Sequence, residues 1–174
     1  MISFDINKPS QLITISSATA ADLPAIAALA DLVWRAHYPG IITVAQIDYM
    51  LARMYDLEVM RQELARGICY DRALVDGQLL GFASYGPVAA RELKLHKLYV
   101  HPEWQRRGLG SRLLQHLEEQ GRQRGFAAVI LAVNKRNDKA VAAYRKNGFA
   151  VREALTNEIG GGFVMDDYVM AKNL

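Results

Sequence analysis

Two glycines stand at the start of a predicted helix, directly after two arginines, in the run Arg106, Arg107, Gly108, Leu109, Gly110. A helix N-terminus offers unpaired N–H groups and the positive end of the helix dipole, and both attract anions. Glycines there let the backbone approach a ligand closely, and the arginines add positive charge. The run therefore indicates a site for a phosphate-bearing ligand, although a strand-to-helix turn without a ligand would show the same glycines.

Two familiar nucleotide motifs do not fit this run. The dinucleotide fingerprint requires a third glycine or alanine three residues after Gly110, where this chain has Leu113. The phosphate loop of nucleoside triphosphatases requires Gly-Lys followed by Ser or Thr, which does not occur in the sequence. If this run binds a phosphate, it belongs to neither of these two types of site.

Two adjacent acids, Asp166 and Asp167, interrupt an apolar strand predicted near the end of the sequence. Because side chains alternate along a strand, the two carboxylates must point to opposite faces of the sheet. One of them could bind the amine of a substrate. The competing interpretation is a charge pair at an edge strand or near a turn.

Hydrophobic periodicity and turn residues predict the elements that position these groups. The predicted strands cover residues 12–15, 68–75, 78–85, 92–100, 127–133, 149–155 and 163–171. The predicted helices cover about residues 22–38, 43–66 with a break near Tyr55, 109–125 and 137–147. Asn137 is expected to cap the last helix and Gly148 to end it, and Asp76 with Gly77 predicts a hairpin turn. This order predicts an α/β protein with a mixed sheet and helices on both faces.

The length, charge and cysteine count of the chain exclude several other classes of protein. The 174 residues suit one domain, which we place at residues 11–174 behind a flexible arm at residues 1–10. A net charge of +3 is too small to indicate nucleic-acid binding, and the single cysteine excludes an internal disulfide. Because no signal peptide or transmembrane run is visible, we expect a cytoplasmic protein without a membrane partner.

Two segments together resemble a known family. Residues 98–114 resemble motif A of the GNAT (Gcn5-related N-acetyltransferase) superfamily, and residues 137–149 resemble its motif B. The resemblance covers about residues 12–172. It implies a mixed, mostly antiparallel, seven-stranded sheet with helices on both faces and a splayed pair of parallel strands. It also implies acetyl-CoA as the cofactor, no metal, and acetyl transfer to an amine.

The family pattern assigns the cofactor site residue by residue. The pantetheine arm would pair with exposed backbone in the splayed pair, and the pyrophosphate would lie at the glycine run. The resemblance thereby implies cofactor contacts from Leu98, Tyr99, Val100, Gln105, Arg106, Arg107, Gly108, Leu109, Gly110, Ser111, Asn134, Asn137 and Tyr144.

The resemblance identifies a general acid but leaves the general base open. Tyr144 matches the position of the family's usual general acid. A phenol with a pKa of about 10 can donate a proton to a thiolate whose conjugate pKa is about 8.5. The alternative is a core tyrosine packed against Phe149. For the general base, Glu92 and His96 are the candidates, since Lys94 stands where the family has a glutamate. A water relay without a single base is the remaining option.

The acceptor is expected to be a small amine. Trp34 and Tyr38, with Asp166 or Asp167, are the substrate-binding candidates, and their segments look similar to PaiA-type polyamine acetyltransferases. The alternatives are acetylation of a protein N-terminus or lysine, and a non-catalytic acyl-CoA-binding regulatory module. Closure of the acceptor side by the loop at residues 37–47 would favour a small molecule, and an open groove would favour a peptide. Dimers are common in the family, so a homodimer is also expected.

Overall fold

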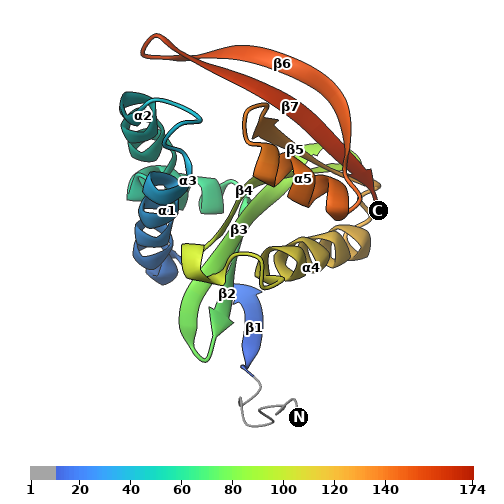
Figure 1. The fold of residues 1–174 in the computed structure, drawn as a ribbon. Coiled ribbons are helices and arrows are strands. Elements are labelled where there is room, and N and C mark those ends of the chain that lie inside the picture. Colours follow the sequence, from blue (N-terminus) through green and yellow to red (C-terminus); the bar gives the residue numbers. More distant parts are fainter. Residues whose placement is uncertain (1–10) are drawn as a thin grey trace, which may run out of the picture.

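Seven strands form one sheet in the order β1-β2-β3-β4-β5-β7-β6 in the computed structural model, which describes residues 11–174 (Figure 1). The strands are β1 Ile13–Ser17, β2 Cys69–Val75, β3 Gln78–Ala89, β4 Glu92–Val100, β5 Ala128–Asn134, β6 Ala150–Gly160 and β7 Phe163–Asn173. The helices are α1 Leu23–His37, α2 Val44–Met54, α3 Leu57–Ala65, α4 Leu109–Gln123 and α5 Asp138–Lys146. The expected arm at residues 1–10 lies outside the described residues.

The pair β4–β5 is parallel, whereas the other neighbouring strands are antiparallel. Helix α4 connects the two parallel strands, as a parallel pair requires. The expected fold, with its mostly antiparallel seven-stranded sheet, is therefore confirmed.

The sheet has a hydrophobic core on each face. Helices α4 and α5 cover one face, where Leu109, Leu113, Leu117 and Val141 are buried against the strands. Helices α1, α2 and α3 cover the other face (Figure 1). In α1 the apolar side chains recur with helical spacing, so one side of the helix is buried.

Three helices begin at capping residues close to the positions expected from the sequence. Thr43 caps α2 through Gln46 N, Asp56 caps α3, and Asn137 caps α5 through Ala140 N. The hairpin turn between β2 and β3 is also confirmed, since Asp76 and Gly77 have φ angles of 49° and 84°. No helix in the described chain is long and apolar enough to cross a membrane.

Five strands continue beyond their expected ends, β1 to Ser17, β3 to Ala89, β5 to Asn134, β6 to Gly160 and β7 to Asn173. Strand β6 is exposed at every residue except Ile159, so the alternation of buried and exposed side chains that predicts a strand is missing. Strands β6 and β7 form a long hairpin that arches across the molecule toward α2 (Figure 1).

Candidate active site

The parallel strands β4 and β5 separate before they end. Their pairing runs from Glu92 with Ala128 to Leu95 with Leu131 and then stops. Beyond that point β4 still pairs with β3, and β5 still pairs with β7. We call residues 96–100 of β4 and 132–134 of β5 the splayed segment. In the described chain its inner edges carry backbone N–H and C=O groups without a strand partner, which an extended ligand can pair with.

A bulge in β4 marks where the splayed segment begins. Ser84 of β3 lies opposite Lys97, and the next residue, Tyr85, lies opposite Leu95, so His96 is the extra residue. A bulge bends and twists its strand, which gives a physical reason for β4 to turn away from β5 here.

The N-terminus of α4 lies directly after β4 in the chain and has no side-chain cap. Gly108, the residue before the helix, has a φ of 83° and makes no capping hydrogen bond. A Cβ at Gly108 would have no heavy atom within 4 Å, so the space beside this glycine is open. Leu109 is buried in the core and anchors the start of the helix. The backbone N–H groups of Leu109, Gly110 and Ser111 have no partner within the helix, because they belong to its first turn.

Polar side chains surround this helix end. Gln105 Nε2 donates to the carbonyl oxygen of Val100 at 3.2 Å and so ties the glycine run to the end of β4. The guanidinium of Arg107 lies 4.9 Å from the centre of the Trp104 ring. Arg106 is exposed and has a φ of 61°, an uncommon conformation for a residue with a side chain. The uncapped amides and the two guanidiniums fit a pyrophosphate.

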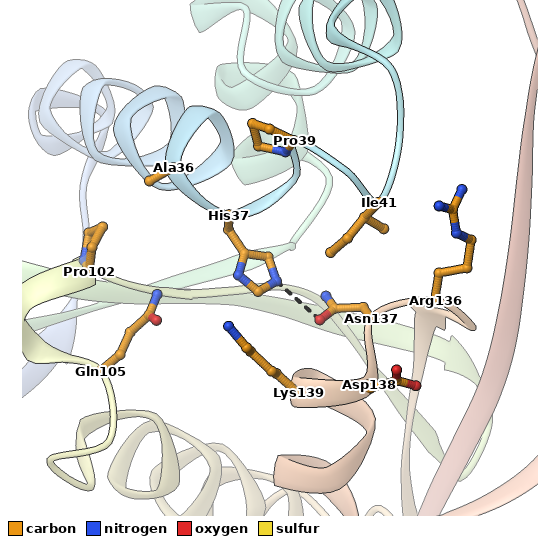
Figure 2. A pocket seen from close by; sticks show the side chains of 10 residues that line it. All are labelled: Ala36, His37, Pro39, Ile41, Pro102, Gln105, Arg136, Asn137, Asp138 and Lys139. Carbon is orange, nitrogen blue, oxygen red and sulfur yellow. Dashed lines mark hydrogen bonds between the residues drawn. The ribbon is translucent and has the colours of Figure 1, made fainter.

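A pocket with a cavity volume of 370 Å³ lies between the end of α1 and the start of α5 (Figure 2). His37 Nε2 lies 3.0 Å from Asn137 Oδ1 in this pocket, and the same oxygen accepts from Ala140 N at 3.3 Å. Figure 2 shows the side chains of His37, Gln105 and Lys139 pointing into it from three different segments. Asn137 therefore caps α5 and contacts α1 at the same time.

Tyr144 lies two turns into α5, on the helix side that faces the sheet. Burial raises the pKa of its phenol, and the nearby Tyr38 raises it further, so the hydroxyl keeps its proton at neutral pH. Its ring packs on Phe149 with 5.8 Å between ring centres. The packing role and a proton-donating role are compatible, because the ring and the hydroxyl are different parts of the side chain.

Aromatic side chains gather where the end of α1 meets β4. Tyr38 Oη and Tyr99 Oη lie 3.3 Å apart, and the Trp34 ring packs on Tyr38 with 4.3 Å between centres. Burial raises the pKa of both Tyr38 and Tyr99. Trp34 is almost fully buried and its Nε1 has no partner, so it shapes this region mainly by packing.

A second pocket, with a cavity volume of 420 Å³, lies between the α1–α2 loop and β7. Gln46 Nε2 donates to the carbonyl oxygen of Val164 at 3.1 Å, and Tyr49 Oη donates to that of Ile159 at 2.8 Å. These bonds fasten the β6–β7 hairpin onto α2. The hairpin and the α1–α2 loop therefore border this pocket together.

The two candidate bases lie in different surroundings. Glu92 is at the start of β4, where Arg152 Nη1 lies 2.6 Å from its Oε1. Six residues of strand separate Glu92 from Leu98, which is about 20 Å at 3.3 Å per residue. His96 lies at the start of the splayed segment with its Nε2 buried and unpartnered. Burial, with Lys94 and Lys97 nearby, lowers the pKa of His96 to about 4.

The two acids of β7 also differ. Asp166 is exposed, pairs with Lys135 and accepts from Thr156 Oγ1 at 3.0 Å, and these bonds lower its pKa. Asp167 is 8% exposed, and its Oδ1 has no hydrogen-bond partner. Burial and the charge of Asp166 raise the pKa of Asp167 to about 6. The alternation argument placed the two on opposite faces without saying which one was buried.

One residue of the site had no sequence signal. Arg136 lines both pockets, and its Nη2 donates to the carbonyl oxygen of Gly40 at 3.0 Å. It lies in the short connection before Asn137, where a single arginine has no informative spacing. The contact of His37 with Asn137 across the pocket was not expected either.

Comparisons with known proteins agree with this geometry. A model of the acetyltransferase (GNAT) family matches residues 26–149. A spermidine N(1)-acetyltransferase of Thermoplasma acidophilum is 27% identical over 159 residues, covering 88% of this chain and 96% of that protein. The crystal structure of the PaiA N-acetyltransferase from Thermoplasma acidophilum, in complex with coenzyme A, superposes with a TM-score of 0.81 and 27% identity over 94% of this chain and 99% of that one. A ribosomal-protein-alanine N-acetyltransferase from Brucella melitensis superposes with a TM-score of 0.72 and 29% identity, over 92% and 99% of the chains.

Proposed function

Because the chain belongs to the acetyltransferase (GNAT) family and is an acetyl-CoA-dependent acyltransferase, we propose that it acetylates a primary amine of a small molecule, with a polyamine such as spermidine as the first candidate. The observation that carries this proposal is the pocket between the β6–β7 hairpin and the α1–α2 loop. The fastened β6–β7 hairpin and the α1–α2 loop bound the second pocket, which Asp166 lines, and the buried Asp167 is the next residue of β7. The likeness to a spermidine acetyltransferase supports the same choice.

The donor half of the site is assigned to the splayed segment and the start of α4. Acetyl-CoA supplies an acetyl group activated as a thioester. The amides of residues 108–111 would hold the pyrophosphate, with Arg106 and Arg107 beside them. The unpaired backbone of Leu98, Tyr99 and Val100 would bind the pantetheine arm as a strand binds its neighbour.

Two side chains of α5 and its cap complete the donor half. Asn137 holds the start of α5 in place through its cap and keeps its amide nitrogen free for a ligand carbonyl. Tyr144 holds a proton on Oη at neutral pH and would donate it to the leaving sulfur. Its raised pKa supports the role of donor over that of base.

The acceptor half lies across the splayed segment. Trp34 and Tyr38 pack on each other and would form an apolar and aromatic wall, which suits the methylene groups of a polyamine. Asp167 is the acidic side chain that we assign to the acceptor amine. We assign Asp166 a smaller part, because its charge is already paired with Lys135.

A thiol-release assay with acetyl-CoA and a panel of acceptors tests this function. The panel contains spermidine, spermine, putrescine, lysine and a peptide with an N-terminal alanine. We expect turnover with a polyamine and little with the peptide. Turnover with the peptide alone would replace the small-molecule function by protein acetylation, and coenzyme A binding without turnover of any acceptor would indicate a regulatory module.

Two further features stay predictions. We propose that residues 11–174 act as a single N-acetyltransferase domain. We also propose a homodimer, which light scattering of the purified protein tests.

A further inference from the structure

Among the described residues, Asp167 differs from the other acids near the splayed segment in having a buried carboxyl oxygen without a hydrogen-bond partner. Glu92 pairs with Arg152, and Asp166 pairs with Lys135. The Oδ1 atom of Asp167 is buried and has no hydrogen-bond partner in the described chain, and the residue as a whole is 8% exposed. A buried carboxylate without a partner is costly, so its retention needs an explanation in function.

The register of the sheet places Asp167 beside the splayed segment. Asp167 lies opposite Asn134, the last residue of β5, on the side of β5 that faces away from β4. Met165, two residues earlier on the same face, packs in the core beneath α1 and α2. The carboxylate of Asp167 therefore faces the acceptor side.

Tyr38 relates Asp167 to the general-acid candidate. The charge of Asp167 raises the pKa of Tyr38, and Tyr38 in turn raises the pKa of Tyr144. Tyr38 Oη lies 3.3 Å from Tyr99 Oη on one edge of the splayed segment, and Asp167 lies opposite Asn134 at the other edge. Tyr38, Tyr99 and Met165 pack in the same apolar cluster, so Tyr38 and Asp167 border the splayed segment from the same face of the sheet. A carboxylate and a protonated phenol at opposite sides of one region are the two groups that an acyl transfer to an amine requires.

We propose that Asp167 is the general base of the reaction and accepts the first proton from the acceptor ammonium, an assignment that rests on the proposed amine acetylation. The ammonium gives one proton to Asp167 and becomes a neutral amine with a free electron pair. The N–C bond to the acetyl carbon then forms and the C–S bond breaks. A second proton of the nitrogen replaces the one that Tyr144 donates to the sulfur, and the third stays on the amide.

The surroundings of Asp167 favour this transfer. Burial disfavours both a carboxylate and an ammonium, so moving the proton from nitrogen to oxygen removes two buried charges at once. Four groups interact electrostatically with the carboxyl, namely Asp166 from β7, Lys135 from the β5–α5 connection, Lys94 from β4, and Tyr38 from the end of α1. Burial is the largest influence on its pKa, and Asp166 adds to it, while the two lysines act in the opposite direction.

The first test observes the carboxyl directly in the protein without acetyl-CoA. Carbon-13 NMR of aspartate-labelled protein, with Asp167→Asn to assign the resonance, should show this carboxyl titrating near pH 6. Adding spermidine as the probe should shift that resonance. A carboxyl that titrates near pH 4 and does not respond to spermidine would overturn the proposal, whether or not the enzyme is active.

The second test separates proton transfer from amine binding. Asp167→Asn should lower kcat by about 100-fold or more, with a smaller change in KM for the amine. The wild-type kcat/KM should fall as pH drops below about 6, and that fall should vanish in the variant. The matched control is Asp31→Asn, which changes an exposed acid on α1 and should leave kcat unaltered.

The outcomes distinguish this proposal from the proposed function. A variant that raises only KM would make Asp167 an anchor for the ammonium and overturn its role as a base. A wild type that acetylates no amine would overturn the proposed function itself. Circular dichroism shows whether the Asp167→Asn variant is folded. If it is not, the NMR titration of Asp167 in the wild-type protein still tests the proposed base.

Discussion

His37 Nε2 and Asn137 Oδ1 lie 3.0 Å apart and join the last residue of α1 to the N-cap of α5. The two residues come from elements on opposite faces of the sheet, since α1 packs in one core and α5 in the other. One oxygen atom thus caps a helix and links the two halves of the candidate site (Figure 2).

This shared oxygen predicts energetic coupling between the two residues. Asn137→Ala should lower the free energy of unfolding by about 1 kcal/mol through the lost cap, in addition to the lost contact with His37. In a double-mutant cycle with His37→Ala, measured by urea unfolding, the coupling should be about 1 kcal/mol. Additive effects within about 0.3 kcal/mol would mean that the contact contributes nothing.

Tyr144→Phe separates catalysis from cofactor binding. The change removes one hydroxyl and keeps the ring that packs on Phe149. We expect coenzyme A affinity by calorimetry to stay within about twofold, while kcat falls by about 100-fold. Unchanged turnover would remove Tyr144 from the role of general acid, and a matching loss of affinity would make it a binding residue.

Gly108→Ala tests the phosphate site at the start of α4, with Gly125→Ala as its matched control. Both glycines have positive φ angles, 83° and 79°, and a Cβ at either would have no atom within 4 Å. Alanine should therefore lower stability by a similar amount at both, roughly 1–2 kcal/mol. Only Gly108→Ala should also weaken coenzyme A binding, by about tenfold or more. Equal affinities for the two variants would contradict a pyrophosphate at this helix end.

The pKa of Asp167 predicts how stability depends on pH. The pKa is raised to about 6 on folding, so the native state binds a proton more readily than the unfolded chain between about pH 4 and 6. The contribution of this group to stability is therefore full below about pH 4 and is lost as pH rises through 6. Relative to wild type, Asp167→Asn should gain stability between pH 4 and pH 7, by up to roughly 3 kcal/mol. Thermal unfolding of both proteins across this range measures it, and a pH-independent difference would contradict the raised pKa.

Local signals allowed much of the fold to be predicted. The cap at Asn137, the turn at Asp76 and Gly77, and the strand at Glu92–Val100 depend on neighbouring residues, and the structure has all of them as expected. The ends of β6 and β7 depend instead on pairing between distant residues and on an exposed hairpin, for which the sequence carries no period.

The candidate site was predictable only in its residue types. The sequence identified Glu92 and His96 as candidate bases, but it could not reveal the bulge at His96 or the ion pair of Glu92 with Arg152. Alternation separated Asp166 from Asp167 by face only. It could not choose between the two, because burial depends on what packs against each face. The contacts of His37 and Arg136 join segments about 100 residues apart, which no local pattern records.

Hydrogen exchange with and without coenzyme A tests the central claim most directly, because it locates the donor site without any acceptor. The splayed segment and the start of α4 should gain protection, at the amides of residues 98–100 and 108–111. The Gly125 end of α4 and strand β1 should exchange at the same rate in both samples. Binding of coenzyme A that protects other segments and leaves residues 98–100 and 108–111 unchanged would contradict the account.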